Sequence, residues 1–167
     1  MAKKTPTSET PETSLIKQAT QRHAGSHLDA SLLWDQVFEV GAALIDHESK
    51  VLSKYKLSRS RLRVLLLLNE EPKRRPSYLA ETLGITKASI TGLAESLSKD
   101  GLISAAANTR DRRSHTLSIT AKGKGLLKKT LPGYYPKLAE ALASLSRQEQ
   151  AQLSQILQKW VSGIRKA

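Results

Sequence analysis

Apolar residues recur along most of this chain at intervals of three and four, the spacing of one face of an α-helix. The first clear run extends from about residue 28 to residue 54. Its apolar face consists of Leu33, Val37, Val40, Leu44 and Val51, with His47 in the one remaining place. A helix of this length with so narrow a seam usually packs along another long helix. The pattern therefore predicts a long helix at a helix–helix interface.

The next stretch predicts three shorter helices. Ser58 can cap a helix over RLRVLLLLN, whose five consecutive apolar residues indicate burial on all sides. A helix over SYLAETLG ends at Gly84, and Thr86 can cap another helix that ends at Gly101. The inner stripe of that last helix is Ile90, Leu93, Ala94 and Leu97. Two short helices joined by a glycine-containing turn are typical of a helix-turn-helix, although such pairs also occur in other proteins.

Alternation of apolar and polar residues follows directly, and it predicts a two-stranded hairpin. One strand begins at residues 102–103, and the returning strand covers residues 115–120. The tip between them carries Arg110, Arg112 and Arg113 around Asp111. Guanidinium groups suit the narrow, strongly negative minor groove of DNA, and Asp111 would hold a neighbouring arginine in place. Taken alone, the tip would be an exposed charged loop whose ion pairs contribute little.

Helical spacing returns after Thr120, and the helix should bend or briefly break at Pro132 and Pro136. Ser146 and Glu149 form a capping box that opens a last helix. The apolar face of that helix is Leu153, Ile156, Leu157, Trp160 and Ile164. Near the start of the chain, Pro11 can begin a short helix, whereas a mobile tail and an arm that folds onto a partner subunit are the alternatives.

The positive charge of the chain is concentrated in its middle. The net charge is +12, with −2 over residues 1–50, +9 over residues 51–125 and +5 over residues 126–167. A field centred on the helix pair and hairpin indicates a polyanionic partner such as nucleic acid. The absence of cysteine excludes disulfides, and no apolar run reaches the roughly 18 residues of a membrane span. The opening MAKKTPTSETPETS lacks the apolar stretch of a signal peptide, so we expect a cytosolic protein.

The sequence gives little support to an enzyme. It contains no glycine-rich phosphate loop, no HExxH, no cysteine nucleophile and no paired carboxylates of the kind that hold a nuclease metal. His23, His27 and Asp29 are close enough in sequence to bind a metal, but we expect no metal site in that segment. No cofactor is expected.

Three stretches resemble the MarR (multiple-antibiotic-resistance regulator) family of winged helix-turn-helix transcription factors. They are LAETLGITKASITGLAESLSKDGLI, the hairpin segment DRRSHTLSITAKG, and SRQEQAQL near the C terminus, and the resemblance covers roughly residues 33–164. The resemblance implies a mainly α-helical fold with a small two-stranded β-wing. It also implies a homodimer that binds a pseudo-palindromic operator in double-stranded DNA, usually as a repressor. Many such proteins release DNA when a small, often aromatic or phenolic acid effector binds.

On this resemblance, residues 58–120 form the winged lobe and residues 28–57 and 121–167 the helical dimerisation region, while residues 1–27 form a flexible arm or short extra helix. Residues 86–96 would lie in the major groove and Ser77 against a phosphate. Arg113 would enter the minor groove, with Arg112 as an additional candidate. The candidate DNA-binding residues are Ser77, Thr86, Lys87, Ser89, Thr91, Arg110, Asp111, Arg112 and Arg113. Trp34, His47 and Arg61 are candidate effector-binding residues, with packed core positions as the alternative.

The recognition helix departs from the family pattern. Family members often carry arginines where this chain has Gly92 and Ser96, and Ala88 and Gly92 fall opposite the buried stripe. We therefore expect the recognition helix to make few direct contacts with bases. Contacts of the wing and contacts with phosphates would supply most of the affinity. An operator-specific regulator is the leading hypothesis. The alternatives are a basic architectural protein that coats DNA without operator preference and, more distantly, an enzyme acting on nucleic acid.

Overall fold

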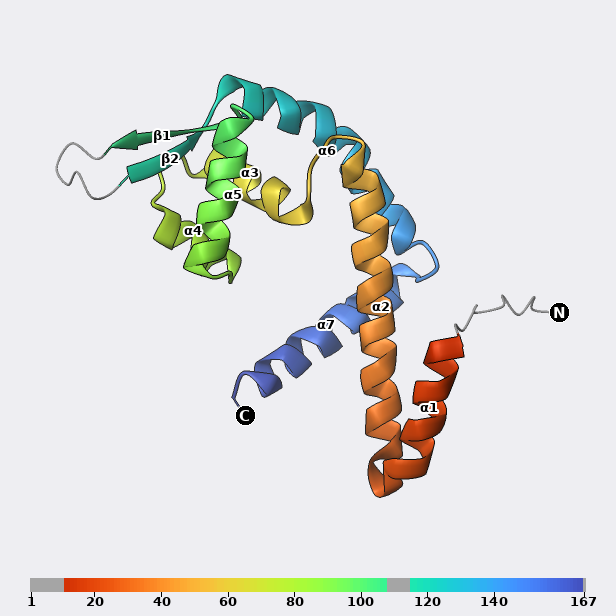
Figure 1. The fold of residues 1–167 in the computed structure, drawn as a ribbon. Helices are drawn as coiled ribbons and strands as arrows, with labels where there is room; N and C mark the ends of the chain where they lie inside the picture. Colours follow the sequence, from red (N-terminus) through yellow and green to blue (C-terminus); the bar gives the residue numbers. More distant parts are fainter. Residues whose placement is uncertain (1–10, 108–114, 167) are drawn as a thin grey trace. The chain divides into compact units, whose positions relative to one another are not determined.

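The computed structural model describes residues 11–107 and 115–166 (Figure 1). The chain divides into two compact units, one that ends at Asp46 and one that begins at His47, and each is described by itself. The described elements are helices α1 to α7, one short 3₁₀ turn and strands β1 and β2. This confirms the predicted fold class, a mainly α-helical chain with a two-stranded wing.

The first unit is a helical hairpin. It contains α1 (Pro11–His23), a 3₁₀ turn (Gly25–His27) and most of α2 (Leu28–Ser53). A helix therefore does start at Pro11, and α2 ends one residue before the predicted boundary. The described residues bury Val51 but leave the earlier part of the apolar face of α2 open, because Leu33, Val37, Val40 and Leu44 are 37% to 58% exposed.

The predicted helix pair is α4 (Pro76–Leu83) and α5 (Lys87–Lys99), preceded by α3 (Arg59–Glu70). The predicted caps are confirmed, because Ser58 Oγ accepts a hydrogen bond from the Arg61 N–H and Thr86 Oγ1 accepts one from the Ser89 N–H. Gly84 ends α4 at a φ of +66°, a left-handed conformation that glycine adopts without the steric cost of a Cβ.

The expectation that α3 is buried on all sides is wrong. Leu62, Val64, Leu65 and Leu68 are buried. Leu66 and Leu67 are only half-buried, and Arg63 is exposed. The reason is that α4, α5, α6 and β2 all pack against α3 but cover only part of its circumference. The apolar run in the sequence therefore overstates how completely the helix is enclosed.

Strands β1 (Ile103–Ala107) and β2 (His115–Ile119) form the predicted antiparallel hairpin, with Ile103 opposite Ile119. Leu117, at 1% exposure, is the residue through which β2 joins the core. It also exchanges two backbone hydrogen bonds with Arg74: Arg74 N–H donates over 3.1 Å and Leu117 N–H over 2.8 Å. The segment before α4 thus lies along β2 and holds the strands of the wing beside the helix pair (Figure 1).

Helix α6 (Ala121–Ala141) begins at a dense set of hydrogen bonds around Thr120. Thr120 Oγ1 accepts from the Gly123 N–H and donates to the Gly101 carbonyl. The Thr120 N–H donates to the Leu102 carbonyl over 3.0 Å. The Thr-x-x-Gly motif therefore joins the first turn of α6 to the turn between α5 and β1.

Of the two outcomes expected at Pro132 and Pro136, a bend or a brief break, the break does not occur. Helix α6 runs from Ala121 to Ala141 through both prolines, and Figure 1 shows that it curves instead. Each proline removes one backbone hydrogen bond. Buried side chains on both sides of Pro132, such as Leu127 and Tyr134, pack in the second unit and keep the flanking turns in place.

A buried carboxylate joins α2, α3 and α6. Glu48 is 4% exposed. Its Oε1 accepts a hydrogen bond from the Tyr134 hydroxyl, and its Oε2 lies 2.7 Å from Arg59 Nη1. The neighbouring His47 is half-buried, and its Nε2–H donates to the Lys137 carbonyl over 3.0 Å. These contacts fix the C-terminal end of α2 against α3 and α6.

We expect Tyr134→Phe to lower the free energy of unfolding by about 1 kcal/mol at neutral pH, because Glu48 loses a hydrogen bond in a buried site. Burial and the hydrogen bond to Glu48 raise the pKa of Tyr134 to about 12. A raised folded-state pKa means that this stabilisation is complete below about pH 10, the ordinary value for tyrosine, and is lost as the pH rises toward 12. Urea unfolding of both proteins should therefore show a difference that narrows only above about pH 10. A difference that stays constant across this range would contradict the assignment.

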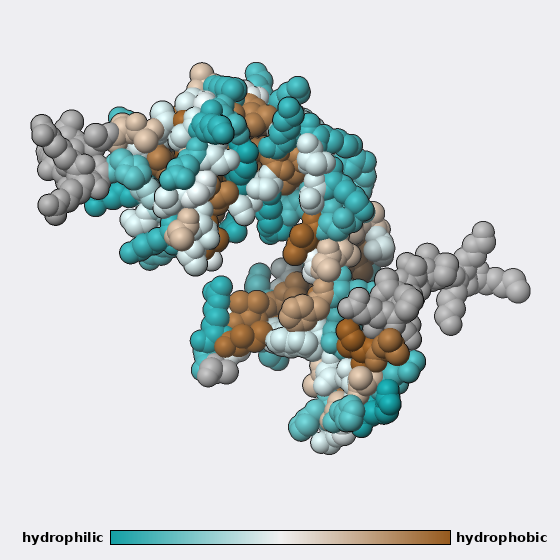
Figure 2. All heavy atoms as spheres, viewed as in Figure 1, coloured by the Kyte–Doolittle hydropathy of each residue, from teal (hydrophilic) through white to brown (hydrophobic). Residues whose placement is uncertain are grey.

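The capping box at Ser146 is present and opens α7 (Arg147–Ile164) as predicted. No residue of α7 is buried, and Figure 2 shows apolar side chains gathered on the surface over this helix. Across the described residues, the large apolar side chains that are exposed all fall within residues 15–45 or 135–164. None of the helices in the described part of the chain has the length and apolar character needed to cross a membrane.

Candidate nucleic-acid interface

The N-terminal half of α5 carries the side chains predicted to read bases. Thr86, Lys87, Ser89 and Thr91 are all exposed there. The Thr86 and Ser89 hydroxyl oxygens lie 2.8 Å apart, and Thr91 Oγ1 donates to the Lys87 carbonyl over 2.9 Å. Two of these three hydroxyl protons are therefore used within the helix, so little hydrogen-bond donor capacity is left for base edges.

The outer face of α5 is flat. Ala88 and Gly92 are exposed and lie opposite the buried residues Ile90 and Ala94, as predicted. A Cβ added at Gly92 would meet nothing within 4 Å. This surface can approach another molecule closely, but its small side chains offer no polar group. The one acidic side chain of α5, Glu95, is also exposed, and the sequence analysis did not single it out although helical spacing puts it on this face.

The first turn of α4 is open to solvent beside α5. Ser77 is exposed and follows Pro76, the first residue of the helix. Arg75 occupies the N-cap position, and no side chain caps the helix. Backbone N–H groups at an uncapped helix start are suited to an anion such as phosphate.

The basic turn before α4 holds one of its three cations rigidly. Arg74 Nε lies 3.0 Å from Glu71 Oε2, and its guanidinium lies 5.0 Å from the centre of the Tyr78 ring. The Tyr78 hydroxyl donates to the same Glu71 carboxylate, and this hydrogen bond raises the pKa of Tyr78. Lys73 and Arg75 on either side are exposed. The sequence did not predict the roles of Glu71 and Tyr78, because their spacing does not indicate that both contact Arg74.

The four candidate residues at the hairpin tip, Arg110, Asp111, Arg112 and Arg113, lie outside the described residues. The structure describes the strands on either side of them and the bond between Arg74 and Leu117 that anchors these strands. It therefore supports the position of the wing base relative to α4, but it does not test the contacts assigned to the tip.

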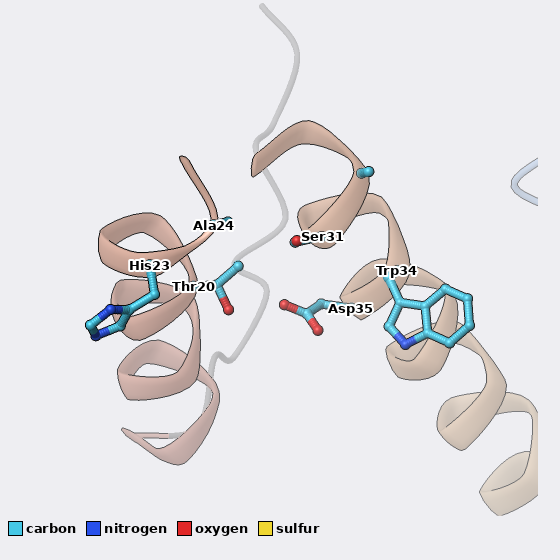
Figure 3. Close-up of a pocket in the computed structure, with 7 residues that line it drawn as sticks. Thr20, His23, Ala24, Ser31, Trp34 and Asp35 are labelled. Carbon is cyan, nitrogen blue, oxygen red and sulfur yellow. The ribbon is translucent and has the colours of Figure 1, made fainter. Parts of the chain in front are cut away.

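The three candidate effector residues are divided between the two units: Trp34 lies in the first, and His47 and Arg61 lie in the second. Trp34 lines an open pocket of about 590 Å³ in the first unit, and neither His47 nor Arg61 lines it. Figure 3 shows Thr20 and Asp35 facing each other across that pocket, while the ring of Trp34 points away from it. His47 is bonded to α6, as described above.

Arg61 is held at the other end of α5. Its Nη2 forms an ion pair with Asp100, the residue that caps α5, and the hydrogen bond and charge of Arg61 lower the pKa of Asp100. The Nε of Arg61 is buried and has no hydrogen-bond partner among the described residues. Lys122 donates to the backbone carbonyl of Asp100, so α3, α5 and α6 meet at this point.

A sequence model of the MarR family matches residues 55–114, which run from the start of the winged lobe to the hairpin tip. The HTH-type transcriptional repressor YetL of Bacillus subtilis is 35% identical over 95 residues, which are 56% of this chain and 57% of YetL. The transcriptional repressor MprA of Escherichia coli K12 is 28% identical over 155 residues, which are 92% of this chain and 88% of MprA.

A solved structure gives the same fold. Sco3205, a MarR family transcriptional regulator from Streptomyces coelicolor in complex with DNA, matches 80% of this chain and 86% of its own with a TM-score of 0.73 at 24% identity. The relatives that match by sequence are transcriptional regulators and not enzymes. The family model, the relatives and the fold agree with the capped helix pair and anchored wing described above. The chain therefore matches the MarR family model over residues 55–114, and its fold is similar to that of a winged helix-turn-helix regulator of that family.

Proposed function

We propose that this protein is a homodimeric repressor that binds a pseudo-palindromic operator in double-stranded DNA and is released by a small-molecule effector. The observation that carries the proposal is the exposed, Thr86-capped start of α5 next to wing strands held by Arg74. In this mechanism α5 enters the major groove, where Lys87, Ser89 and Thr91 face base edges. Ser77 and the first turn of α4 contact a phosphate.

The wing supplies the strongest electrostatic contact in this mechanism. Arg112 and Arg113 insert into the minor groove next to the major groove that α5 occupies, and Asp111 orients them. Because α5 offers few polar groups to bases, phosphate and minor-groove contacts supply most of the affinity. Binding should therefore weaken steeply as salt is added.

We expect Arg113→Ala to weaken operator binding about tenfold and to reduce the dependence of affinity on salt, because a cation is removed from a negative groove. Fluorescence anisotropy with a labelled operator duplex at several salt concentrations measures both quantities. Arg147→Ala is the matched control, since Arg147 is an exposed arginine in the first turn of α7. Wild-type affinity in Arg113→Ala would remove the wing tip from the mechanism.

The exposed apolar faces support a dimer of this chain. They lie on α1, α2, the end of α6 and α7, which are the segments that the resemblance assigns to dimerisation. An isolated chain would leave an unusual amount of large apolar side chain in water. Sedimentation of the intact protein should give twice the mass of one chain, and a monomer at micromolar concentration would contradict the dimer.

An architectural protein that coats DNA remains the second candidate function, and the flat face at Ala88 and Gly92 is the observation that favours it. The two functions differ in the ratio of specific to non-specific affinity. Competition between a palindromic site from the neighbouring intergenic DNA and bulk DNA measures that ratio. A ratio near one would support the architectural protein and contradict the operator-specific repressor.

We assign the effector to the class of aromatic or phenolic acids, with Trp34, His47 and Arg61 as the residues that contact it. The buried Nε of Arg61 supports an anionic group, since it is a hydrogen-bond donor without a described partner. A ligand that binds only the folded protein raises its melting temperature. Thermal-shift screening of phenolic and carboxylic acids tests this class, and a screen in which only neutral or cationic compounds stabilise the protein would contradict it.

A further inference from the structure

We propose that Glu95 sets the operator preference of this protein by accepting a hydrogen bond from the exocyclic amine of a cytosine in the major groove. This inference rests on the proposed operator binding by α5 and adds the base class that the helix selects. It concerns a carboxylate that the candidate DNA-binding residues do not include.

The position of Glu95 follows from the buried face of α5. Ile90, Ala94 and Leu97 are buried and fix which side of the helix faces the core. Helical spacing then puts Glu95 on the opposite side, together with Ala88 and Gly92, and all three are exposed. Gly92 precedes Glu95 by about one turn and has open space around it. Toward the start of α5, no bulky neighbour on this face keeps the carboxylate away from a groove.

The carboxylate of Glu95 forms no ion pair within the described part of the chain. The helical neighbours of Glu95 are Thr91 and Gly92 one turn before it and Ser98 and Lys99 one turn after it, so Lys99 is the cation of α5 that lies beside it. The hydroxyl of Thr91 is already bonded to the Lys87 carbonyl. Glu95 is therefore the strongest hydrogen-bond acceptor on the outer face of α5.

The chemistry of a carboxylate limits what Glu95 can recognise. An ionised carboxylate only accepts hydrogen bonds, and the N4 amine of cytosine is the major-groove donor that acidic side chains typically contact. The same charge repels phosphates, so it disfavours DNA in which no amine faces the helix. Glu95 thus adds sequence preference to a protein whose remaining contacts are mainly with the DNA backbone, and it lowers affinity for bulk DNA.

The test is selection of bound duplexes from a randomised pool by the full-length protein, its Glu95→Gln and Glu95→Ala variants, and Glu81→Gln as control. Glu81 is an exposed glutamate of α4, so its replacement makes the same change in net charge within the same lobe. We expect wild type and Glu81→Gln to select a cytosine at one symmetric position of each half-site. Glu95→Ala should lose that preference, and Glu95→Gln should shift it toward adenine, which glutamine contacts through N6 and N7.

Binding constants for the selected duplex and for one with that cytosine replaced give the size of the effect. We expect the replacement to weaken wild-type binding about fivefold or more and to leave Glu95→Ala almost unaffected. If wild type selects a site but all four proteins prefer the same bases, Glu95 has no role in specificity. The proposed operator-specific binding would then be retained, and only the role of Glu95 would be contradicted. If wild type selects no sequence at all, the proposed operator-specific function itself fails.

Discussion

Gly123→Ala is expected to destabilise the second unit by about 3 kcal/mol, a large part of the roughly 5–15 kcal/mol that stabilises a typical folded protein. An added Cβ would overlap the backbone carbonyl of Leu102 and come within 2.7 Å of Ile119 Cγ1. The Leu102 carbonyl cannot move away freely, because it accepts the hydrogen bond from the Thr120 N–H. The substitution therefore strains the junction of β1, β2 and α6, on which the wing is built.

Gly125→Ala is the matched control for this prediction. Gly125 lies in the same helix, and a Cβ added there meets nothing within 4 Å. Alanine in place of glycine inside a helix usually stabilises by about 0.5–1 kcal/mol. Urea unfolding followed by circular dichroism compares the two variants with wild type. Similar unfolding midpoints for Gly123→Ala and Gly125→Ala would show that close packing at Gly123 is not required.

Helix boundaries were predictable from the sequence because a helix cap depends on residues within a single turn. Ser58, Thr86 and Ser146 are the confirmed examples, and each accepts a hydrogen bond from a backbone N–H three residues later. The prolines of α6 show the limit of such local rules. Each proline costs a backbone hydrogen bond within its own turn. The packing that outweighs this loss involves side chains such as Tyr134, which bonds to Glu48 on α2.

The candidate site was predictable in its residue types but not in its contacts. Helical spacing identified which side of α5 is exposed, whereas only the structure shows that the Thr91 hydroxyl turns back to Lys87. The ion pair of Arg61 could not be predicted for a different reason: its partner Asp100 is 39 residues away in the sequence, and no spacing pattern connects the two. The contacts of Arg110 to Arg113 stay predictions, since these residues lie outside the described part of the chain.

The second large effect is expected for Arg59→Met, which removes the charge that faces the buried carboxylate of Glu48. The Glu48 side chain is 5% exposed, so water cannot replace the lost partner, and only the Tyr134 hydroxyl still stabilises the charge. Breaking a fully buried pair typically costs about 3–5 kcal/mol. The Arg59 side chain is 63% exposed, which screens the interaction, so we expect a loss of about 2 kcal/mol at pH 7.

Combining Arg59→Met with Glu48→Gln separates a charge effect from a packing effect. Methionine keeps most of the length of the arginine side chain, so the main change at Arg59 is electrostatic. Glutamine at position 48 carries no charge, so Arg59→Met should cost less stability in the Glu48→Gln background than in wild type. Arg63→Met is the control, because Arg63 is exposed on the same helix and makes no described ion pair. Chemical unfolding at pH 7 compares each variant with its own background. A loss that is equally large in both backgrounds would mean that Arg59 acts through packing, and the buried carboxylate would then need no cation to hold α2 against α3.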